Sequence, residues 1–182
     1  MAHLTRYYMY NRIRECLEKN KLFPLDGKIL GISGIDNFRP LISKKAKVMD
    51  TKYPEVNMQK LPFESNSFDC VISDQVIEHV RSPKEAIDES YRVLNRNGVA
   101  IHTTCFLNYI HCGPIDFWRF SPESLRYLCS DFSQILDYGG WGNRFAILLC
   151  FVSERFRYME IPNSRWSIRH LVATYNEKKY PI

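Results

Sequence analysis

Polar residues that could bind a ligand follow short apolar segments at two points between residues 46 and 75. Asp50 closes the segment AKVM, and Asp74 and Gln75 close the segment FDCVIS. In parallel α/β sheets, ligands bind beyond the carboxyl ends of the strands. A carboxylate roughly 20 residues after the first strand-to-helix turn is where a ribose diol is held by two hydrogen bonds. Asp50 has this position, although a turn aspartate is the alternative interpretation.

A loop with two glycines precedes Asp50 and is a candidate ligand loop. Gly31, Ser33, Gly34 and Asp36 belong to it, directly after or within the apolar segment KILGI. Glycine lets backbone amides approach a ligand closely, and a following helix supplies its positive end. The spacing is not GxGxxG, so an ordinary strand-to-helix turn stays an alternative.

The six cysteines form no CxxC pair. The sequence therefore predicts no metal ligands and favours structural thiols in a reducing cytoplasm.

Length and composition favour one domain with a real core over 1–182. We divide it into a leading helix and turn (1–27), a core (28–143) and a C-terminal extension (144–182). The formal net charge is +5, with basic residues concentrated near the two ends. This excess is typical of a solvated surface, so a nucleic-acid partner is not expected. No apolar run reaches the length of a membrane span.

Apolar periodicity and turn residues predict alternating helices and strands. Residues 4–19 are expected to form a helix, and a weaker helix is expected over 39–45. Strands are expected over 28–32, 46–49, 68–73, 99–104 and 133–138. Helices are expected over 83–94, with Ser82 as N-cap, and over 121–129. Residues 144–154 are assigned to a helix or a strand. The pattern is typical of an α/β, doubly wound, mainly parallel sheet with helices on both faces.

Several motifs together resemble class I S-adenosylmethionine-dependent methyltransferases of the small-molecule branch, over about residues 28–143. The matching residues are Leu61-Pro62-Phe63, Phe68-Asp69-Cys70-Val71-Ile72, Glu78-His79-Val80 and Arg92-Val93-Leu94-Asn95-Arg96-Asn97-Gly98. Two further blocks are similar to that branch, DFWRFSPESL at 116–125 and GGWGN at 139–143.

The resemblance implies a Rossmann-like fold, S-adenosylmethionine as cofactor and direct in-line methyl transfer to a small-molecule or sugar-like acceptor. It implies that Asp50 holds the ribose hydroxyls and that Asn57 stands beside the adenine amino group. Met58 and Leu61 would flank the adenine ring, although a core role is at least as plausible for both. Asp74 and Gln75 would face the methionine end of the cofactor. The resemblance also makes His79, His111 and Asp116 the candidates for proton handling towards an acceptor hydroxyl. The alternatives are structural, since a lone histidine often only packs and Asp116 could form an ion pair with Arg119. The cofactor-binding set is Gly31, Ser33, Gly34, Asp36, Asp50, Asn57, Met58, Leu61, Asp74 and Gln75.

The glycine loop departs most from the family's pattern LDIGCGxG. Gly31 replaces the acidic residue, Ser33 the first glycine and Ile35 the second. Loss of one charge-assisted hydrogen bond costs on the order of 1.5–3 kcal/mol, unless Asp36 substitutes for the missing acid. A catalytically inactive methyltransferase-like binding or scaffold protein is therefore the alternative function. A nicotinamide-dependent oxidoreductase and an RNA methyltransferase fit the motifs less well.

The C-terminal end also departs from the family. Family members usually finish with an antiparallel strand, whereas residues 172–175 are the only candidate for one here. We therefore expect a sheet that lacks the final strand. Its open edge could be covered by a second copy of the chain in a homodimer.

Overall fold

The computed structural model describes all residues except 1–2, 5, 112–114, 141–143, 162–165 and 175–182. The chain divides into two compact units, Lys21–Tyr138 and the pair of segments Met1–Asn20 with Gly139–Ile182. The organisation of 1–182 as one domain stays a prediction.

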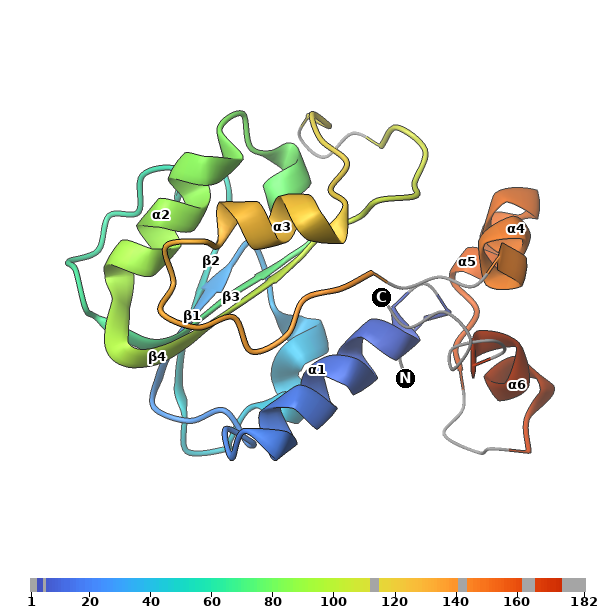
Figure 1. The fold of residues 1–182 in the computed structure, drawn as a ribbon, viewed down its shortest axis with the longest axis horizontal. Helices are drawn as coiled ribbons and strands as arrows, with labels where there is room; N and C mark the ends of the chain where they lie inside the picture. The colour runs from blue at the N-terminus through green and yellow to red at the C-terminus, as the bar shows by residue number, and fades with distance from the viewer. Residues whose placement is uncertain (1–2, 5, 112–114, 141–143, 162–165, 175–182) are drawn as a thin grey trace. The chain divides into compact units, whose positions relative to one another are not determined.

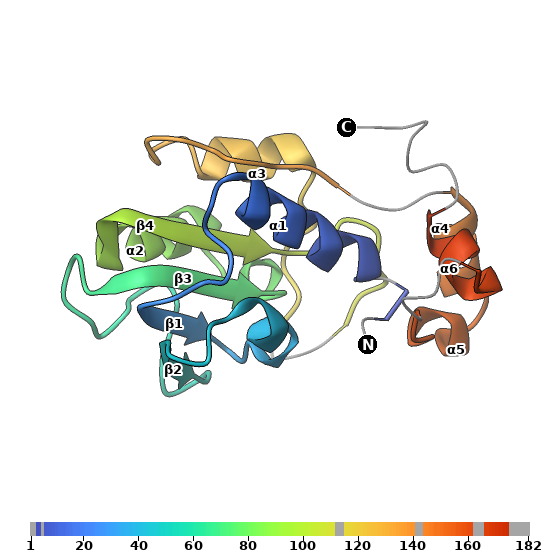
Figure 2. The same cartoon turned by 90° about the horizontal axis from the view of Figure 1, so that it is seen from below.

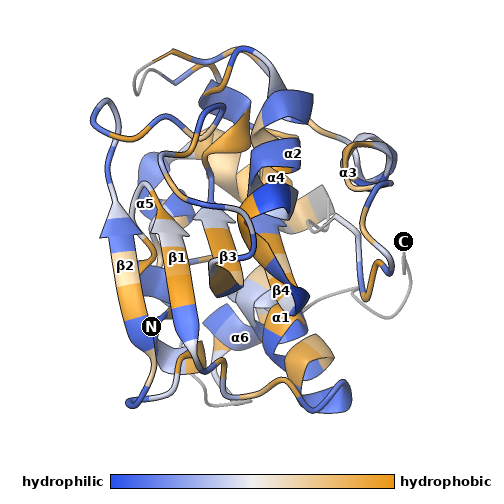
Figure 3. Ribbon diagram, turned by 90° about the vertical axis from the view of Figure 1, so that its left-hand side faces the viewer, coloured by the Kyte–Doolittle hydropathy of each residue, from blue (hydrophilic) through white to orange (hydrophobic). Residues whose placement is uncertain are grey.

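The larger unit is built on a four-stranded parallel sheet in the order β2-β1-β3-β4 (Figures 1 and 2). Its strands are β1 (Lys28–Ile32), β2 (Lys47–Thr51), β3 (Phe68–Asp74) and β4 (Leu94–Thr103). The middle of β1 and β3 is hydrophobic, as Figure 3 shows. A strand buried on both faces reads as a near-continuous apolar run, which is why FDCVISD forms the central strand β3.

Two helices pack on one face of this sheet, α2 (Pro83–Val93) and α3 (Pro122–Leu128) (Figure 1). Leu30 and Ile32 of β1 share a buried cluster with Ile87 of α2 and Leu128 of α3. Alternate residues of a strand point to opposite faces, so Gly31 faces the other way. There it lies against Ile35, which precedes the 3₁₀ helix η1 (Asp36–Leu41). The α/β class with a parallel sheet is confirmed.

The capping role predicted for Ser82 was wrong, whereas α3 has a serine cap. The Ser121 hydroxyl accepts a hydrogen bond from the Ser124 amide at 3.3 Å. Ser82 has the N-cap position of α2, but its side chain makes no capping bond. Pro83 begins that helix with a preset φ, so α2 starts there without the capping bond.

Several predicted boundaries were wrong. β4 begins at Leu94, directly after α2, so Asn97-Gly98 lies within the strand rather than ending a helix. The expected strand over 133–138 is irregular, and the weak helix over 39–45 is replaced by η1. Residues 172–174 belong to a helix, so they do not supply the antiparallel strand. Tyr175 and residues 141–143 lie outside the described part.

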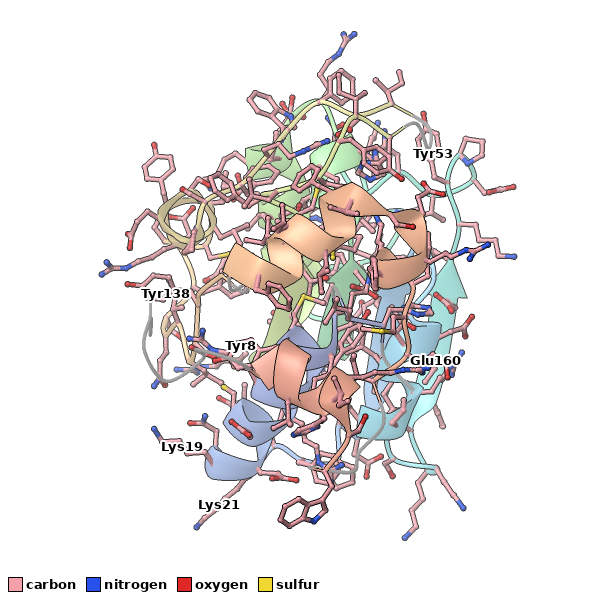
Figure 4. The ribbon with its side chains drawn as sticks, turned by 90° about the vertical axis from the view of Figure 1, so that its right-hand side faces the viewer. Tyr8, Lys19, Lys21, Tyr53, Tyr138 and Glu160 are labelled. Atoms are coloured by element: carbon pink, nitrogen blue, oxygen red, sulfur yellow. The ribbon has the colours of Figure 1, made fainter. Side chains whose placement is uncertain are left out.

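The smaller unit consists of helices α1 (Tyr7–Lys19), α4 (Arg144–Val152), α5 (Glu154–Arg157) and α6 (Ile168–Thr174). Leu4, Tyr7 and Ile161 form its buried cluster, and the Leu4 amide donates to the Met159 carbonyl at 2.8 Å. Lys19 extends away from the end of α1 (Figure 4). Across the described ranges, every helix is too short or too polar to cross a membrane.

Candidate functional site

The carboxyl ends of β1 and β3 form the edge at which a ligand is expected. From β1 the chain passes to β2 on one side, whereas β3 leads to β4 on the other. In open α/β sheets the crevice outside the strand ends at such a switch point is the preferred ligand site. Ser33 follows β1 at this edge, and Asp74 ends β3.

The loop after β1 turns through two consecutive residues with positive φ. Ser33 has φ 61° and Gly34 has φ 95°. A side chain built on Gly34 would meet no described atom within 4 Å. The Gly34 backbone is therefore open to a ligand, while Ser33 adopts a conformation that non-glycine residues reach only at a cost.

Gly31 and Asp50 face one another at the same edge. They are register partners in the β1–β2 pair. A Cβ on Gly31 would lie 2.7 Å from Oδ1 of Asp50 and 2.7 Å from Cγ1 of Ile35. The Asp50 side chain keeps 31% of its surface exposed, and its Oδ2 lies 3.8 Å from Nη2 of Arg39. Asp50 thus lies over the glycine and keeps about a third of its side chain exposed.

Asp36 does not join Asp50 in this position. Its side chain is 93% exposed, and its Oδ1 lies 3.8 Å from Nε of Arg39. The same guanidinium therefore lies within ion-pair distance of both carboxylates, and pairs this exposed are weak. Asp36 as the replacement for the missing acidic residue stays a prediction that this geometry does not favour.

Asp74 is held at the edge by partners on two neighbouring segments. Its Oδ1 accepts from Thr103 Oγ1 at 2.5 Å, and its Oδ2 accepts from Asn37 Nδ2 at 3.3 Å. Gln75 has φ 59°, and its amide donates to the Thr103 carbonyl at 3.0 Å. Asn37 and Thr103 were not among the predicted site residues. Their positions just beyond β1 and at the end of β4 are the signal that could have identified them.

The residues expected around adenine lie partly in the core. Met58 and Leu61 are 2% and 4% exposed and belong to the cluster beneath α2. Asn57 Oδ1 accepts from the Gln59 amide at 2.9 Å, which stabilises a local turn. The structure thus gives all three residues a packing or turn role, and their contact with adenine stays a prediction.

An ion pair from α2 holds the Leu61-Pro62-Phe63 turn. Arg92 donates to the carbonyls of Leu61 and Phe63 at 3.1 and 2.8 Å. Its Nε and Nη2 also pair with both oxygens of Glu89, at 2.6 and 2.8 Å. The Arg92 guanidinium keeps the pKa of the Glu89 carboxyl below its ordinary value. The Leu61-Pro62-Phe63 motif and the motif that begins at Arg92 are therefore joined in one structural unit.

The three predicted proton-handling residues come together in a second group. His79 lies on the 3₁₀ helix η2 (Ile77–His79), and His111 lies in the loop after β4. Their ring centroids are 4.9 Å apart in an edge-to-face arrangement. Asp116 Oδ2 lies 3.2 Å from His111 Nδ1 and accepts from the His111 amide at 2.9 Å.

Asp116 is also fixed by Arg119, which contacts both of its carboxylate oxygens, Oδ2 at 2.6 Å. The Arg119 hydrogen bonds are the main reason that the pKa of Asp116 lies well below its ordinary value. A carboxylate with such a low pKa is a poor base near neutral pH. The geometry therefore favours a positioning role for Asp116, and its role in proton transfer remains untested.

The loop that carries Asp116 is anchored on η2. The amides of Phe117 and Trp118 donate to the Glu78 carbonyl at 2.9 and 3.2 Å, and Trp118 Nε1 donates to the Val80 carbonyl at 2.9 Å. A cavity of about 420 Å³ lies beside this anchor. Its lining includes Arg81, Lys84, Trp118, Arg119, Phe120 and Tyr127. This volume falls in the range of small-molecule pockets.

Residues 15–102 match the family described as a methyltransferase domain. These residues, slightly less than half of the chain, are similar to that family. The family predicted from the sequence motifs is thereby confirmed. The match contains β1 to β3, Asp50 and the loop after β1.

Two curated relatives of this methyltransferase domain are similar over a short stretch. A 2-methyl-6-phytyl-1,4-hydroquinone methyltransferase of Oryza sativa is 33% identical over 79 residues, covering 41% of this chain and 22% of the relative. A ubiquinone/menaquinone biosynthesis C-methyltransferase of Brucella canis is 32% identical over 77 residues, covering 42% of this chain and 27% of the relative. The matched stretch spans about a quarter of each relative.

A solved S-adenosylmethionine-dependent methyltransferase of Aquifex aeolicus superposes with a TM-score of 0.48 at 14% identity. The superposition covers 66% of this chain and 81% of that chain. The family membership of the methyltransferase domain rests on the sequence match.

Proposed function

We propose that this chain is a methyltransferase that takes its methyl group from S-adenosylmethionine and transfers it to a small-molecule acceptor. The observation that carries the proposal is the pair of Gly31 and Asp50 at the carboxyl edge of β1 and β2, within a domain of the methyltransferase family. A carboxylate at the end of the second strand is suited to a ribose diol, because its two oxygens can each accept a hydroxyl hydrogen bond.

The residues at this edge fit an adenosyl group. The Asp50 side chain is 31% exposed, and a Cβ on Gly34 would meet no described atom within 4 Å. A ligand can therefore approach the loop closely while its sugar hydroxyls reach the carboxylate. Asp74 offers a further anionic group at the same edge, between Asn37 and Thr103.

S-adenosylmethionine supplies an activated methyl group on a sulfonium, so the protein needs no nucleophile of its own. The chain's residues then have three tasks: to hold the cofactor, to orient the acceptor atom for in-line attack, and to exclude water. Proximity and orientation of this kind can provide much of the rate acceleration. The loop anchored on η2 by Phe117 and Trp118 is suited to excluding water.

His79 and His111 are the proposed groups for any proton released by the acceptor. Their rings are adjacent, and neither is locked in a bidentate ion pair as Asp116 is. The Nδ1 of His79 lies 2.7 Å from the Ile115 carbonyl, so that nitrogen carries the hydrogen and Nε2 is the basic atom. Asp116 and Arg119 would position the loop.

The acceptor is proposed as a class only. The curated relatives are named for hydroquinone and ubiquinone or menaquinone substrates, so a hydroxylated ring compound is one class to test. A sugar-like acceptor is the other. The aromatic side chains of Trp118 and Tyr127 in the nearby cavity could stack on either kind of ring.

The test is a calorimetric titration of the purified chain with S-adenosylmethionine, followed by radiolabelled methyl transfer to a panel of quinols and sugars. The proposal expects saturable binding and an increase in thermal stability. An inactive family member is the alternative, because Ser33 and Ile35 replace the family's loop glycines. Absence of binding heat and of any thermal shift would favour that alternative.

A further inference from the structure

We propose that Glu78, His79 and His111 form a binding site for one divalent cation of the zinc class. One ligand-type atom from each of the three residues lies within 4.8 Å of the others. Glu78 and His79 come from η2 and His111 from the loop after β4, so the ion would join the segments that follow two neighbouring strands. Binding at this site does not depend on methyl transfer, but an ion held there would occupy the nitrogen atoms of His79 and His111 and replace the proton-accepting role proposed above.

We assign Nε2 of each histidine to the proposed ion, because Nδ1 has other partners. The Ile115 carbonyl can only accept a hydrogen bond, so His79 Nδ1, 2.7 Å away, must carry the hydrogen. The resulting tautomer leaves a lone pair on Nε2. Metal-binding histidines almost always have their second nitrogen held in this way by a carbonyl or a carboxylate.

His111 has the carboxylate version of the same arrangement. Its Nδ1 lies 3.2 Å from Oδ2 of Asp116 and 3.4 Å from the Tyr109 carbonyl, two acceptors that favour the hydrogen on Nδ1 and the lone pair on Nε2, and 3.3 Å from one donor, Asn108 Nδ2. Arg119 pairs with both oxygens of Asp116, so the charges of these two residues offset each other beside the site. The resulting order, carboxylate to histidine to ion, is a common pattern around protein-bound zinc.

Glu78 supplies the observation that points independently to a bound cation. The residue is 0% exposed, and its Oε2 accepts from Thr104 Oγ1 at 2.8 Å. Its Oε1 is buried and has no hydrogen-bond partner among the described residues. A buried carboxylate oxygen normally has a partner, because leaving it without one is costly. A cation beside the two imidazoles would provide that partner.

The donor set selects the kind of ion. Two imidazole nitrogens and one carboxylate oxygen suit zinc and similar divalent metals, whereas calcium and magnesium prefer oxygen ligands alone. Ligands at about 2.0–2.2 Å around a tetrahedral zinc ion lie roughly 3.3–3.5 Å apart. The spacing of up to 4.8 Å therefore closes by small side-chain rotations, and a fourth position stays open for water or an acceptor oxygen.

The test is a titration of the chelator-treated full chain with zinc chloride alone, in competition with a chromophoric chelator. The wild type is expected to bind one equivalent, and His79→Gln and His111→Gln are expected to lose affinity by at least about tenfold. His3→Gln is the matched control, since His3 lies in the smaller unit, and it should bind as the wild type does. Equal affinity in the wild type and a His79→Gln/His111→Gln double variant would overturn the proposal.

Cobalt in place of zinc gives a result that needs no variant. The wild-type chain is expected to give cobalt the intense visible absorption of a four- or five-coordinate ion with nitrogen ligands. A spectrum identical to that of aqueous cobalt would overturn the site even if a variant failed to fold. A titration of the chelated chain with S-adenosylmethionine tests the proposed function separately, so either proposal can fail alone.

Discussion

The Gly31 backbone lies directly against the Asp50 carboxylate, so close that a single added methyl group would lie 2.7 Å from Oδ1. β-pairing produces this arrangement, because the two residues are register partners in adjacent parallel strands. The family pattern has an acidic residue where this chain has Gly31. The glycine therefore leaves space for Asp50 at the cost of the carboxylate that the pattern places there.

Gly31→Ala tests whether this space is needed. The new Cβ would crowd Asp50 and Ile35, and overpacking of this kind costs about 1–3 kcal/mol of stability. Because the Asp50 side chain must move, affinity for S-adenosylmethionine is expected to fall as well. Urea unfolding and calorimetry measure the two effects.

Gly98→Ala is the matched control for that substitution. A Cβ on Gly98 would also be crowded, at 2.8 Å from the Leu94 side chain and 2.9 Å from the Asp69 carbonyl, but at the other end of the sheet. It should lose comparable stability and keep the ligand affinity. An equal loss of affinity in both variants would mean that general destabilisation, and not Asp50, is responsible.

Arg92→Lys tests the unit formed by the Leu61-Pro62-Phe63 turn and α2. Lysine cannot reproduce the fork that contacts Glu89 and two backbone carbonyls at once. We expect a loss of about 1–2 kcal/mol in the free energy of unfolding. Arg96→Lys, at an exposed position of β4, should change stability by less than about 0.5 kcal/mol. Equal effects of the two substitutions on urea unfolding would contradict a role for the Arg92 contacts.

The buried ring of His102 makes the free energy of unfolding depend on pH. Burial of its ring lowers its pKa from 6.5 to about 4. The unfolded chain therefore takes up a proton between pH 6.5 and 4 that the folded chain does not, and stability falls as the pH drops through this window. The loss by pH 4 is up to about 3 kcal/mol. Carboxyl groups such as Asp116, whose pKa is lowered, contribute only at more acidic pH.

His102→Gln is expected to flatten this part of the pH profile. Chemical unfolding at intervals between pH 7 and pH 4 measures the slope. A His102→Gln profile as steep as that of the wild type would exclude His102 as the source.

The sequence predicts the sheet well because its strands are short apolar runs bounded by turn residues. β1 begins and ends where periodicity places it, and α2 and α3 begin at the proline of a Ser-Pro pair. The wrong boundary between α2 and β4 has a clear cause. Asn97-Gly98 has the residues of a turn, yet pairing with β3 extends β4 back to Leu94. Tertiary pairing there overrides the local turn preference.

Asp50 and Asp69 show how far the residues of the site can be predicted from the sequence. Asp50 and Asp69 both adjoin apolar strand residues, but Asp69 lies near the amino end of β3. There it accepts from the Lys28 amide at 2.8 Å and from Asn95 Nδ2 at 2.7 Å, which joins three strands. Position along a strand separates a site residue from a structural one. The Asn37–Asp74 contact could not be predicted in the same way, because it depends on how two loops meet in space.

The most direct test of the proposed function is the affinity of Asp50→Asn for S-adenosylmethionine, measured by calorimetry beside the wild type and Asp26→Asn. Asp26 is exposed and precedes β1, so its substitution removes the same charge at the opposite edge of the sheet. We expect a loss of about tenfold to a hundredfold for Asp50→Asn, the value of one charge-assisted hydrogen bond, and no change for Asp26→Asn. Saturable binding with equal affinity in all three proteins would contradict the assignment of the ribose to Asp50.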